Sequence, residues 1–209
     1  MDRGLLIIVS GFSGAGKGAI VRGIISKYDN YALSVSATTR QPREGEIDGK
    51  HYFFISKEEF EKRIAEDKLL EFARYVDNYY GTPKEYVEQM LDAGKDVILE
   101  IEMQGAMKVK SKVPGAITVF VSTKDADTLQ NRLKGRGTET LEQIEKRLER
   151  AVEESDLMNQ YDYLLVNDDL VSAIDNLHDI VCSEHKRSKY NLAFISEIQK
   201  DLKVKFGKK

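Results

Sequence analysis

The chain has 209 residues, a formal net charge of −3 and one cysteine, Cys182. This length suits one α/β domain with insertions and a sizeable core. The charge balance does not indicate binding to nucleic acid or to a membrane surface. A single cysteine excludes an internal disulfide and is typical of a reducing compartment. With no secretory signal pattern and no apolar run of membrane-spanning length, we expect a cytoplasmic protein.

The first motif is a glycine-rich turn between a predicted strand and a predicted helix. The apolar run over residues 5–9 is typical of a buried strand, and apolar residues recur at helical spacing from residue 20 to residue 25. Between them, residues 11–17 match the phosphate-binding pattern GxxxxGK. Glycines let backbone N–H groups converge on phosphate oxygens, and Lys17 supplies a mobile positive charge. The predicted ATP-binding residues of this loop are Gly11, Phe12, Ser13, Gly14, Ala15, Gly16, Lys17, Gly18 and Ala19.

The residues after the loop lysine depart from the standard motif. A Ser or Thr is expected directly after the lysine, because its hydroxyl helps to hold Mg²⁺. Here Gly18 and Ala19 follow, and neither carries a hydroxyl. Two alternatives stay open: water and acidic residues alone hold the metal, or phosphoryl transfer is impaired.

The next segment, residues 36–81, is predicted to be a β-rich insert. A strand over residues 32–36 precedes it, and Arg40 and Arg43 then flank a proline that disfavours a helix. On an extended or turning backbone the two guanidinium groups can converge on one phosphate, although a solvated charged loop is an equal alternative. Further strands are predicted over residues 50–55, 69–75 and 78–81, with a helix that starts at a Ser56 capping box.

The alternating strand–helix pattern resumes at Thr82, which we expect to cap a helix with Pro83 at its first position. Gly94 predicts the end of that helix. Further strands are predicted over residues 116–121 and 163–166, with helices over 123–134, from 140 to about 158, and over 170–181. The glycine-flanked Arg136 lies between two of these helices, where it can swing as a closing lid requires.

The strand predicted over residues 97–102 ends in two carboxylates, Glu100 and Glu102. Ligands of a parallel sheet gather at the carboxyl ends of its strands. The two acids alternate by two residues, so we expect them on one side of the strand. They are candidate Mg²⁺ ligands, directly or through water, with a polar pair at the sheet edge as the alternative.

Several strings together resemble the bacterial type of the guanylate kinase family. They are GFSGAGKG, SVSATTRQPREGEIDGKHYFF, LLEFARY, NYYGTP, ILEIEMQGA, RLKGRGTET, KRL and VNDDL, and they cover the chain to about residue 185. The resemblance implies an α/β fold: a P-loop NTPase-type parallel sheet flanked by helices, with a β-rich NMP-binding insert and a short helical lid. The implied core comprises residues 1–35, 82–122 and 151–209, the GMP-binding insert residues 36–81 and the lid residues 123–150.

The resemblance also implies roles for single residues. The implied GMP-binding residues are Ser36, Arg40, Arg43, Tyr52, Glu71, Tyr80, Thr82, Glu100 and Gly105. The implied catalytic residues, which neutralise charge on the phosphoryl group, are Lys17, Arg40, Arg132, Arg136 and Arg147, and Asn167 with Arg136 lies where the family holds adenine. Glu71 suits guanine, because its carboxylate can accept from N1–H and from the exocyclic amine, whereas adenine would leave a buried charge unpaired.

The expected reaction is ATP + GMP → ADP + GDP, with dGMP as a second acceptor and Mg²⁺ as cofactor, in purine nucleotide metabolism. Three departures from the family pattern stand out: the missing hydroxyl, glutamates where aspartates are frequent at the strand end, and Phe12 in place of a proline. Two alternatives stay open. One is a catalytically weakened guanylate-kinase-like binding module for a protein partner, and the other is a kinase for a different monophosphate, against which Glu71 and Ser36 argue.

The sequence leaves some features open or without a role. A homo-oligomer stays open, and the tail over residues 187–209 is assigned no function. His51, His178 and His185 show no metal-ligand spacing and are expected to be ordinary surface or helix residues.

Overall fold

The computed structural model describes residues 3–75, 77–135 and 140–207. The strands are β1 (Leu6–Gly11), β2 (Tyr31–Leu33), β3 (Ala37–Thr38), β4 (Phe53–Phe54), β5 (Leu69–Tyr75), β6 (Asn78–Pro83), β7 (Asp96–Glu100), β8 (Ile117–Ser122) and β9 (Tyr163–Val166). The α-helices are α1 (Lys17–Lys27), α2 (Lys57–Ala65), α3 (Lys84–Asp92), α4 (Met103–Lys112), α5 (Ala126–Lys134), α6 (Leu141–Ser155), α7 (Leu170–His185) and α8 (Leu192–Phe206). Short 3₁₀ turns occupy Met158–Gln160 and Ser188–Tyr190.

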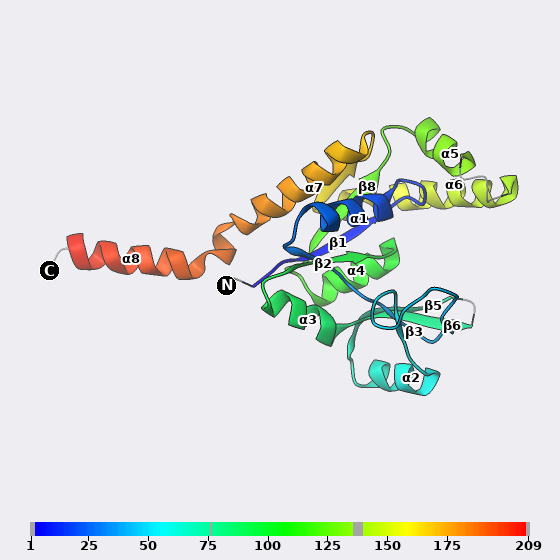
Figure 1. Ribbon diagram of the computed structural model, residues 1–209. Coiled ribbons are helices and arrows are strands. Elements are labelled where there is room, and N and C mark those ends of the chain that lie inside the picture. Colours follow the sequence, from blue (N-terminus) through cyan, green and yellow to red (C-terminus); the bar gives the residue numbers. More distant parts are fainter. Residues whose placement is uncertain (1–2, 76, 136–139, 208–209) are drawn as a thin grey trace.

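The core is a five-stranded parallel sheet in the order β2-β7-β1-β8-β9. Helices α1 and α7 lie on one face, and α3 and α4 lie on the other (Figure 1). Because both faces are covered, β1 and β8 are buried along nearly their whole length and read as continuous apolar runs. The fold class expected from the sequence, a parallel sheet flanked by helices, is confirmed.

A second sheet of four strands, in the order β4-β3-β6-β5, stands beside the core. Its β3–β6 and β5–β6 pairs are antiparallel. It has a small apolar cluster of its own, in which the ring of Phe60 on α2 stacks on Tyr79 at 5.2 Å between centroids. This sheet falls within residues 36–83, so it corresponds to the β-rich insert.

The ends of several elements differ from the sequence prediction. The strand expected over residues 32–36 is the three-residue β2, and the one expected over 50–55 is the two-residue β4. The long helix α6 begins at the predicted Thr140 capping box but ends at Ser155 rather than near Met158. Single backbone bonds continue beyond the short strands, from Ser34 N–H to the carbonyl of Ile98 and from Ile55 N–H to that of Thr38, but the regular ladders end with β2 and β4. Gly94, with φ of +78°, ends α3 as predicted.

Thr82 does not cap α3, so that prediction is wrong. Pro83 is the N-cap residue of α3 and also ends β6, and no side chain among the described residues caps this helix. The hydroxyl of Thr82 instead donates to Glu71 Oε1 at 2.8 Å. The tertiary contact therefore replaces the local cap.

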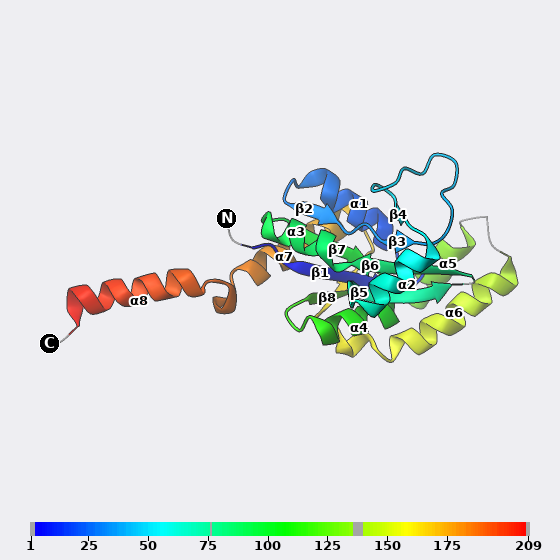
Figure 2. The ribbon, with the colours of Figure 1, turned by 90° about the horizontal axis from the view of Figure 1, so that it is seen from below.

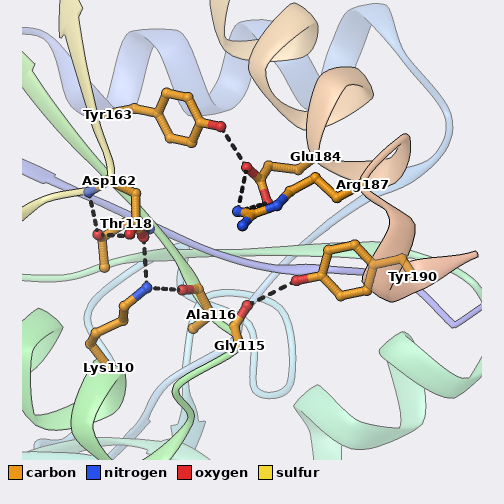
Figure 3. Close-up of polar contacts among 9 residues, drawn as sticks. All are labelled: Lys110, Gly115, Ala116, Thr118, Asp162, Tyr163, Glu184, Arg187 and Tyr190. Carbon is orange, nitrogen blue, oxygen red and sulfur yellow. Dashed lines mark hydrogen bonds and ion pairs between the residues drawn. The ribbon is translucent and has the colours of Figure 1, made fainter.

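Helix α8 projects away from the body of the protein, on the side opposite the phosphate loop (Figures 1 and 2). Its root is held by a polar cluster at the starts of β8 and β9 (Figure 3). There Tyr163 donates to Glu184, the guanidinium of Arg187 contacts the same carboxylate at 3.2 Å, and Tyr190 donates to the carbonyl of Gly115 at 3.2 Å. Beyond this root, α8 buries none of its side chains against the described residues.

Two histidines predicted to be ordinary surface or helix residues are integrated into the packing. The ring of His178 stacks on Tyr28 at 3.7 Å between centroids, and its Nδ1 lies 2.8 Å from the hydroxyl of Tyr31. His185 Nε2 lies 2.8 Å from the buried carboxylate of Asp96. Within the described ranges, none of the helices is long and apolar enough to cross a membrane.

Candidate active site

The glycine-rich loop between β1 and α1 is built so that side chains cannot replace its glycines. Gly11, Gly14 and Gly16 have φ values of +137°, +97° and +93°, which side chains rarely adopt. A β-carbon at Gly11 would lie 2.1 Å from the carbonyl oxygen of Val121, and one at Gly16 would lie 2.4 Å from Asn167 Nδ2. The loop therefore stays close to β8 and β9, with its backbone next to the N-terminus of α1. This is the arrangement that binds phosphate oxygens.

Three side chains support the loop, two from the loop and α1 and one from the end of β9. Lys17 Nζ donates to the carbonyl oxygens of Gly11 at 2.6 Å and Phe12 at 3.0 Å. Phe12, the departure at the proline position, is buried and packs edge-on against Phe120 at 4.9 Å. Asn167, at the end of β9, is also buried and donates to the carbonyl of Ala15 at 2.7 Å. Asn167 thus fixes the loop.

Two predicted lid arginines reach the loop from α5 and α6. Arg132 NH1 donates to the carbonyl of Ala15 at 3.3 Å, and Arg147 donates to the hydroxyl of Ser13. Their positive charges therefore lie beside the place where the loop would hold phosphates. Arg136 lies outside the described residues.

The two strand-end acids lie apart. Glu100 is the last residue of β7, whereas Glu102 follows the strand as the N-cap residue of α4, so the prediction that both lie on one side of the strand is wrong. Glu102 pairs with Arg150 of α6 at 2.8 Å. Partial burial raises the pKa of the Glu100 carboxyl, while the charges of Lys17 and Arg22 oppose that shift.

Glu100 is therefore the acid beside the loop. Its oxygens lie 3.3 and 3.5 Å from the position of a β-carbon on Gly18. The described residues contain no cluster of three or more His, Cys, Asp or Glu side chains that would hold a metal ion by themselves. A hard divalent cation prefers oxygen ligands such as this carboxylate together with substrate phosphates, so Glu100 fits the predicted Mg²⁺.

A cavity of about 150 Å³ lies between the core and the insert. It is lined by Leu33, Ser34, Ser36, His51, Tyr52, Thr82, Leu99, Glu100 and Ile101. The hydroxyl of Thr82 donates to the carboxylate of Glu71, which lies behind it. Burial raises the pKa of the Glu71 carboxyl, although this hydrogen bond acts in the opposite direction. Gly105 leaves room for Glu71, because a β-carbon there would lie 3.3 Å from Glu71 Oε2. Four of the predicted GMP-binding residues, Ser36, Tyr52, Thr82 and Glu100, thus line one cavity.

The predicted phosphate clamp is held together by a residue outside the prediction, Glu46. Arg40 pairs with Glu46 through two hydrogen bonds of 2.9 and 2.8 Å, and the backbone N–H of Arg43 donates to the same carboxylate at 2.7 Å. These contacts lower the pKa of Glu46 to about 2. The guanidinium of Arg40 also lies 5.4 Å from the centre of the Tyr52 ring, which in turn is 6.0 Å from that of Tyr80.

Four further residues lie at the site and were not predicted from the sequence: Arg22, Glu46, His51 and Arg150. Glu46 follows Arg40 by six residues in an irregular loop, so no periodicity indicates their contact. Arg150 and Glu102 are 48 residues apart. A helix pattern places Arg22 on α1 but does not indicate that it faces Glu100. The only indication for His51 was its place next to Tyr52 in one of the strings that resemble the family.

Comparison with known proteins agrees with this geometry. Residues 3–184 match the family model described as guanylate kinase. The chain is 47% identical over 199 residues to guanylate kinase of Caldanaerobacter subterraneus subsp. tengcongensis, covering 95% of this chain and 97% of that protein. It is 52% identical over 187 residues to guanylate kinase of Streptococcus thermophilus, covering 89% of this chain and 90% of that protein.

A solved structure gives the same result. The crystal structure of guanylate kinase from Anaplasma phagocytophilum matches with a TM-score of 0.74 and 25% identity, covering 100% of this chain and 98% of that chain. The family model spans most of the chain, and the curated relatives exceed 45% identity over nearly their full length. The chain therefore belongs to the guanylate kinase family and is a nucleotide-binding kinase.

Proposed function

We propose that this kinase transfers the γ-phosphoryl group of ATP to GMP, and also to dGMP, to give ADP and GDP or dGDP with Mg²⁺. The observation that carries the proposal is the position of Glu100. Its carboxylate lies against Gly18 of the phosphate loop, and the same residue lines the cavity that contains Ser36 and Thr82. One side chain therefore faces both the donor loop and the proposed acceptor cavity.

The proposed donor site is the glycine loop with Lys17, Arg132 and Arg147. Phosphoryl transfer needs two phosphates held in line, exclusion of water and stabilisation of charge on the oxygens, so no catalytic base is required. Lys17 now bonds the loop carbonyls of Gly11 and Phe12, and its ammonium lies within the loop that would surround the β- and γ-phosphates. Arg132 and Arg147 bring guanidinium groups to the same loop. Arg136 joins this set as a proposal from the resemblance.

The proposed acceptor site selects guanine through Glu71 and Thr82. The Glu71 carboxylate can accept from N1–H and the exocyclic amine of guanine. The Thr82 hydroxyl, now donating to Glu71, keeps that carboxylate oriented. Ser36 completes the set on the cavity wall. Adenine would leave the partly buried carboxylate without donors, which costs about 1–3 kcal/mol and disfavours AMP.

Arg40, Arg43, Tyr52 and Tyr80 form the proposed clamp on the GMP phosphate. Arg40 presents a planar fork of donors that matches a phosphate bidentately. At present that fork is bonded to Glu46. We propose that Glu46 keeps Arg40 extended toward the cavity until the phosphate arrives.

Mg²⁺ bound with ATP would neutralise charge on the β- and γ-phosphate oxygens. Glu100 is the residue placed to hold it, directly or through water. Glu102 is a weaker candidate because it pairs with Arg150 and is largely exposed.

The test is a coupled ADP-release assay with ATP, Mg²⁺ and GMP or dGMP, and with AMP, CMP and UMP in parallel. We expect turnover confined to GMP and dGMP. Turnover on another monophosphate would overturn the assignment of Glu71. Binding of GMP without turnover would instead favour the second candidate, a guanylate-kinase-like binding module, which rests on the missing hydroxyl at Gly18 and Ala19.

A further inference from the structure

Helix α8 carries an apolar face that the described residues leave uncovered. Large apolar side chains recur every four residues along one side of the helix, and together they form an apolar stripe: Phe194, Ile198, Leu202 and Phe206. Phe194 is 64% exposed and Phe206 is 76% exposed, and none of the side chains of α8 is buried. Contiguous apolar surface of this kind on a soluble protein marks a site of interaction with another protein or with a membrane.

The root of α8 holds the helix away from the body of the protein. The side-chain amide of Asn191 donates to the carbonyls of His185 and Arg187 at 2.8 and 3.0 Å. Tyr190 donates to the carbonyl of Gly115 at the base of the helix (Figure 3). In both ribbon views α8 stands clear of the core sheet and of the helices that cover it (Figures 1 and 2). The apolar stripe is therefore presented to a partner outside this chain.

The charge of the chain is divided between this tail and the rest. Residues 187–209 contain seven lysines and arginines and two acids, a net charge of +5, so the rest of the chain carries −8. The overall charge of −3, which does not indicate a membrane, conceals this division. Lys203, three residues before Phe206, and Lys205, three residues after Leu202, lie at the two edges of the apolar stripe. A basic amphipathic helix is typical of segments that bind the interface of an anionic membrane.

Two partners suit such a helix, a second copy of this chain and a lipid surface. A second copy would bring the same positive tail and an equally acidic body to the contact, so like charges would oppose the pairing. An anionic lipid surface instead carries the charge opposite to that of the tail. There the stem of Lys205 can lie among lipid while its ammonium, now paired with Asp201 at 2.7 Å, reaches a headgroup. The charges therefore favour the lipid surface.

We propose that α8 docks the protein reversibly on an anionic lipid surface. The apolar stripe enters the boundary between headgroups and acyl chains, and Lys203 and Lys205 contact anionic headgroups on either side of it. Binding by one helix of this length, about 22 Å, is weak enough to be reversible. The phosphate loop lies on the side of the protein opposite α8, so the proposed active site stays open to nucleotides. This docking is separate from phosphoryl transfer and does not depend on the identity of the acceptor.

The first test is co-sedimentation of the whole protein with lipid vesicles. Two compositions are compared: phosphatidylcholine alone, and phosphatidylcholine with about 30% phosphatidylglycerol, an anionic lipid. We expect the protein to bind the anionic vesicles about tenfold more tightly than the neutral ones, because each lysine near the surface adds to the attraction. The chain ended after Asn191 should lose about tenfold or more of the affinity for anionic vesicles, since it lacks the apolar stripe.

A matched pair of variants, I198D and V204D, adds one carboxylate to α8 at two different faces. Ile198 belongs to the apolar stripe, whereas Val204, which is 77% exposed, follows Leu202 by two residues and so lies on the opposite side of the helix. We expect I198D to weaken binding to the anionic vesicles about tenfold, because a carboxylate would have to enter the apolar boundary. V204D changes the charge equally but faces water, so its loss should be about threefold or less. Neither side chain is buried, so both variants should fold, which thermal unfolding verifies.

The results that would overturn the proposal are distinct. Equal binding by the native chain and by the chain ended after Asn191 would place the contact on the body, and equal losses in I198D and V204D would exclude insertion of the apolar stripe. Equal binding to neutral and anionic vesicles would exclude the role of the basic tail. If the vesicles bind no protein and sedimentation equilibrium shows a dimer that the shortened chain does not form, a second copy covers the stripe and the proposal is wrong. None of these results bears on phosphorylation of GMP, which the ADP-release assay tests separately.

Discussion

The glycine-rich loop and the β-rich insert are both proposed to hold a phosphate, and they are built by different means. The loop uses backbone: three of its glycines have positive φ, and Gly11 and Gly16 lie so close to Val121 of β8 and to Asn167 after β9 that added side chains do not fit. The insert uses side chains: Arg40 is held by Glu46, and Glu71 is held by Thr82. A backbone site tolerates almost no substitution at its glycines, whatever side chains support it from outside. A side-chain site tolerates changes in its loops but depends on each partner.

The largest expected effect comes from adding a methyl group to the loop backbone. G11A should lower the free energy of unfolding by about 2–6 kcal/mol, because left-handed strain and overpacking each cost about 1–3 kcal/mol. The overpacking arises against the carbonyl of Val121, 2.1 Å away. The matched control is G45A in the insert, where φ is +82° but no atom lies within 4 Å of the added β-carbon. G45A should cost about 1 kcal/mol from strain alone.

Urea denaturation measures both variants. Equal losses for G11A and G45A would contradict the claim that close packing, beyond backbone conformation, makes the loop glycines necessary.

The second effect concerns Glu71 and Thr82, the side chains proposed to recognise guanine. E71Q should lower kcat/KM for GMP about 100-fold, because one guanine donor then faces an amide N–H instead of a carboxylate oxygen. T82V removes only the hydroxyl that orients this carboxylate, so its loss should be about tenfold. Steady-state kinetics with GMP and AMP give both values. An E71Q enzyme that still discriminates fully against AMP would place guanine recognition elsewhere.

The third effect is the dependence of stability on pH that Glu46 of the insert produces. Contacts with Arg40 and Arg43 lower the pKa of Glu46 from 4.5 to about 2. A carboxyl with a depressed folded pKa adds stability above its unfolded value, and that stability is lost as pH falls from about 4.5 to about 2. The native protein should therefore lose stability more steeply over this window than E46Q.

Thermal unfolding between pH 5 and pH 2 measures this difference, with E44Q as a control at a neighbouring exposed carboxylate. Carboxyl titration of Glu46 by NMR gives its pKa directly. A midpoint near 4.5 would show that the Arg40–Glu46 pair does not persist in solution.

The smallest effect is expected at the C-terminus. A chain ended after Asn191 loses α8 but keeps the polar cluster at its root, including the bond from Tyr190 to Gly115. Because α8 buries no side chain against the described residues, the melting temperature should change by about 2 °C or less. A drop of 5 °C or more, measured by calorimetry, would mean that the apolar side chains of α8 are covered in solution.

The loop and six of the helices were predicted from sequence because their signals are local, whereas α4 and α8 were not predicted. The glycine pattern at residues 11–17, the Thr140 capping box and the apolar period of α7 each lie within one element. The Arg40–Glu46 and Thr82–Glu71 pairs join residues across loops and strands, and no spacing rule indicates them. Thr82 shows the conflict most clearly: its sequence position favours a helix cap, but the carboxylate of Glu71 takes its hydroxyl.

The site's two strand-end acids illustrate a related limit. Glu100 and Glu102 look equivalent in the sequence, but the strand ends between them. As a result Glu100 lies beside the phosphate loop, whereas Glu102 pairs with Arg150. The point where a strand ends depends on its neighbours in the sheet. Sequence alone therefore identified the acidic pair but did not separate its members.

The central place of β1 in the sheet has a consequence for how the chain is made. Among the described strands β1 is made before all the others, but its two neighbours are β7 at residues 96–100 and β8 at residues 117–122. At about 5–20 residues per second, both neighbours follow only after several seconds of synthesis. During that interval the apolar residues of β1 have no sheet partners. The newborn chain therefore depends, for those seconds, on chaperones or on transient collapse to keep this buried strand from aggregating.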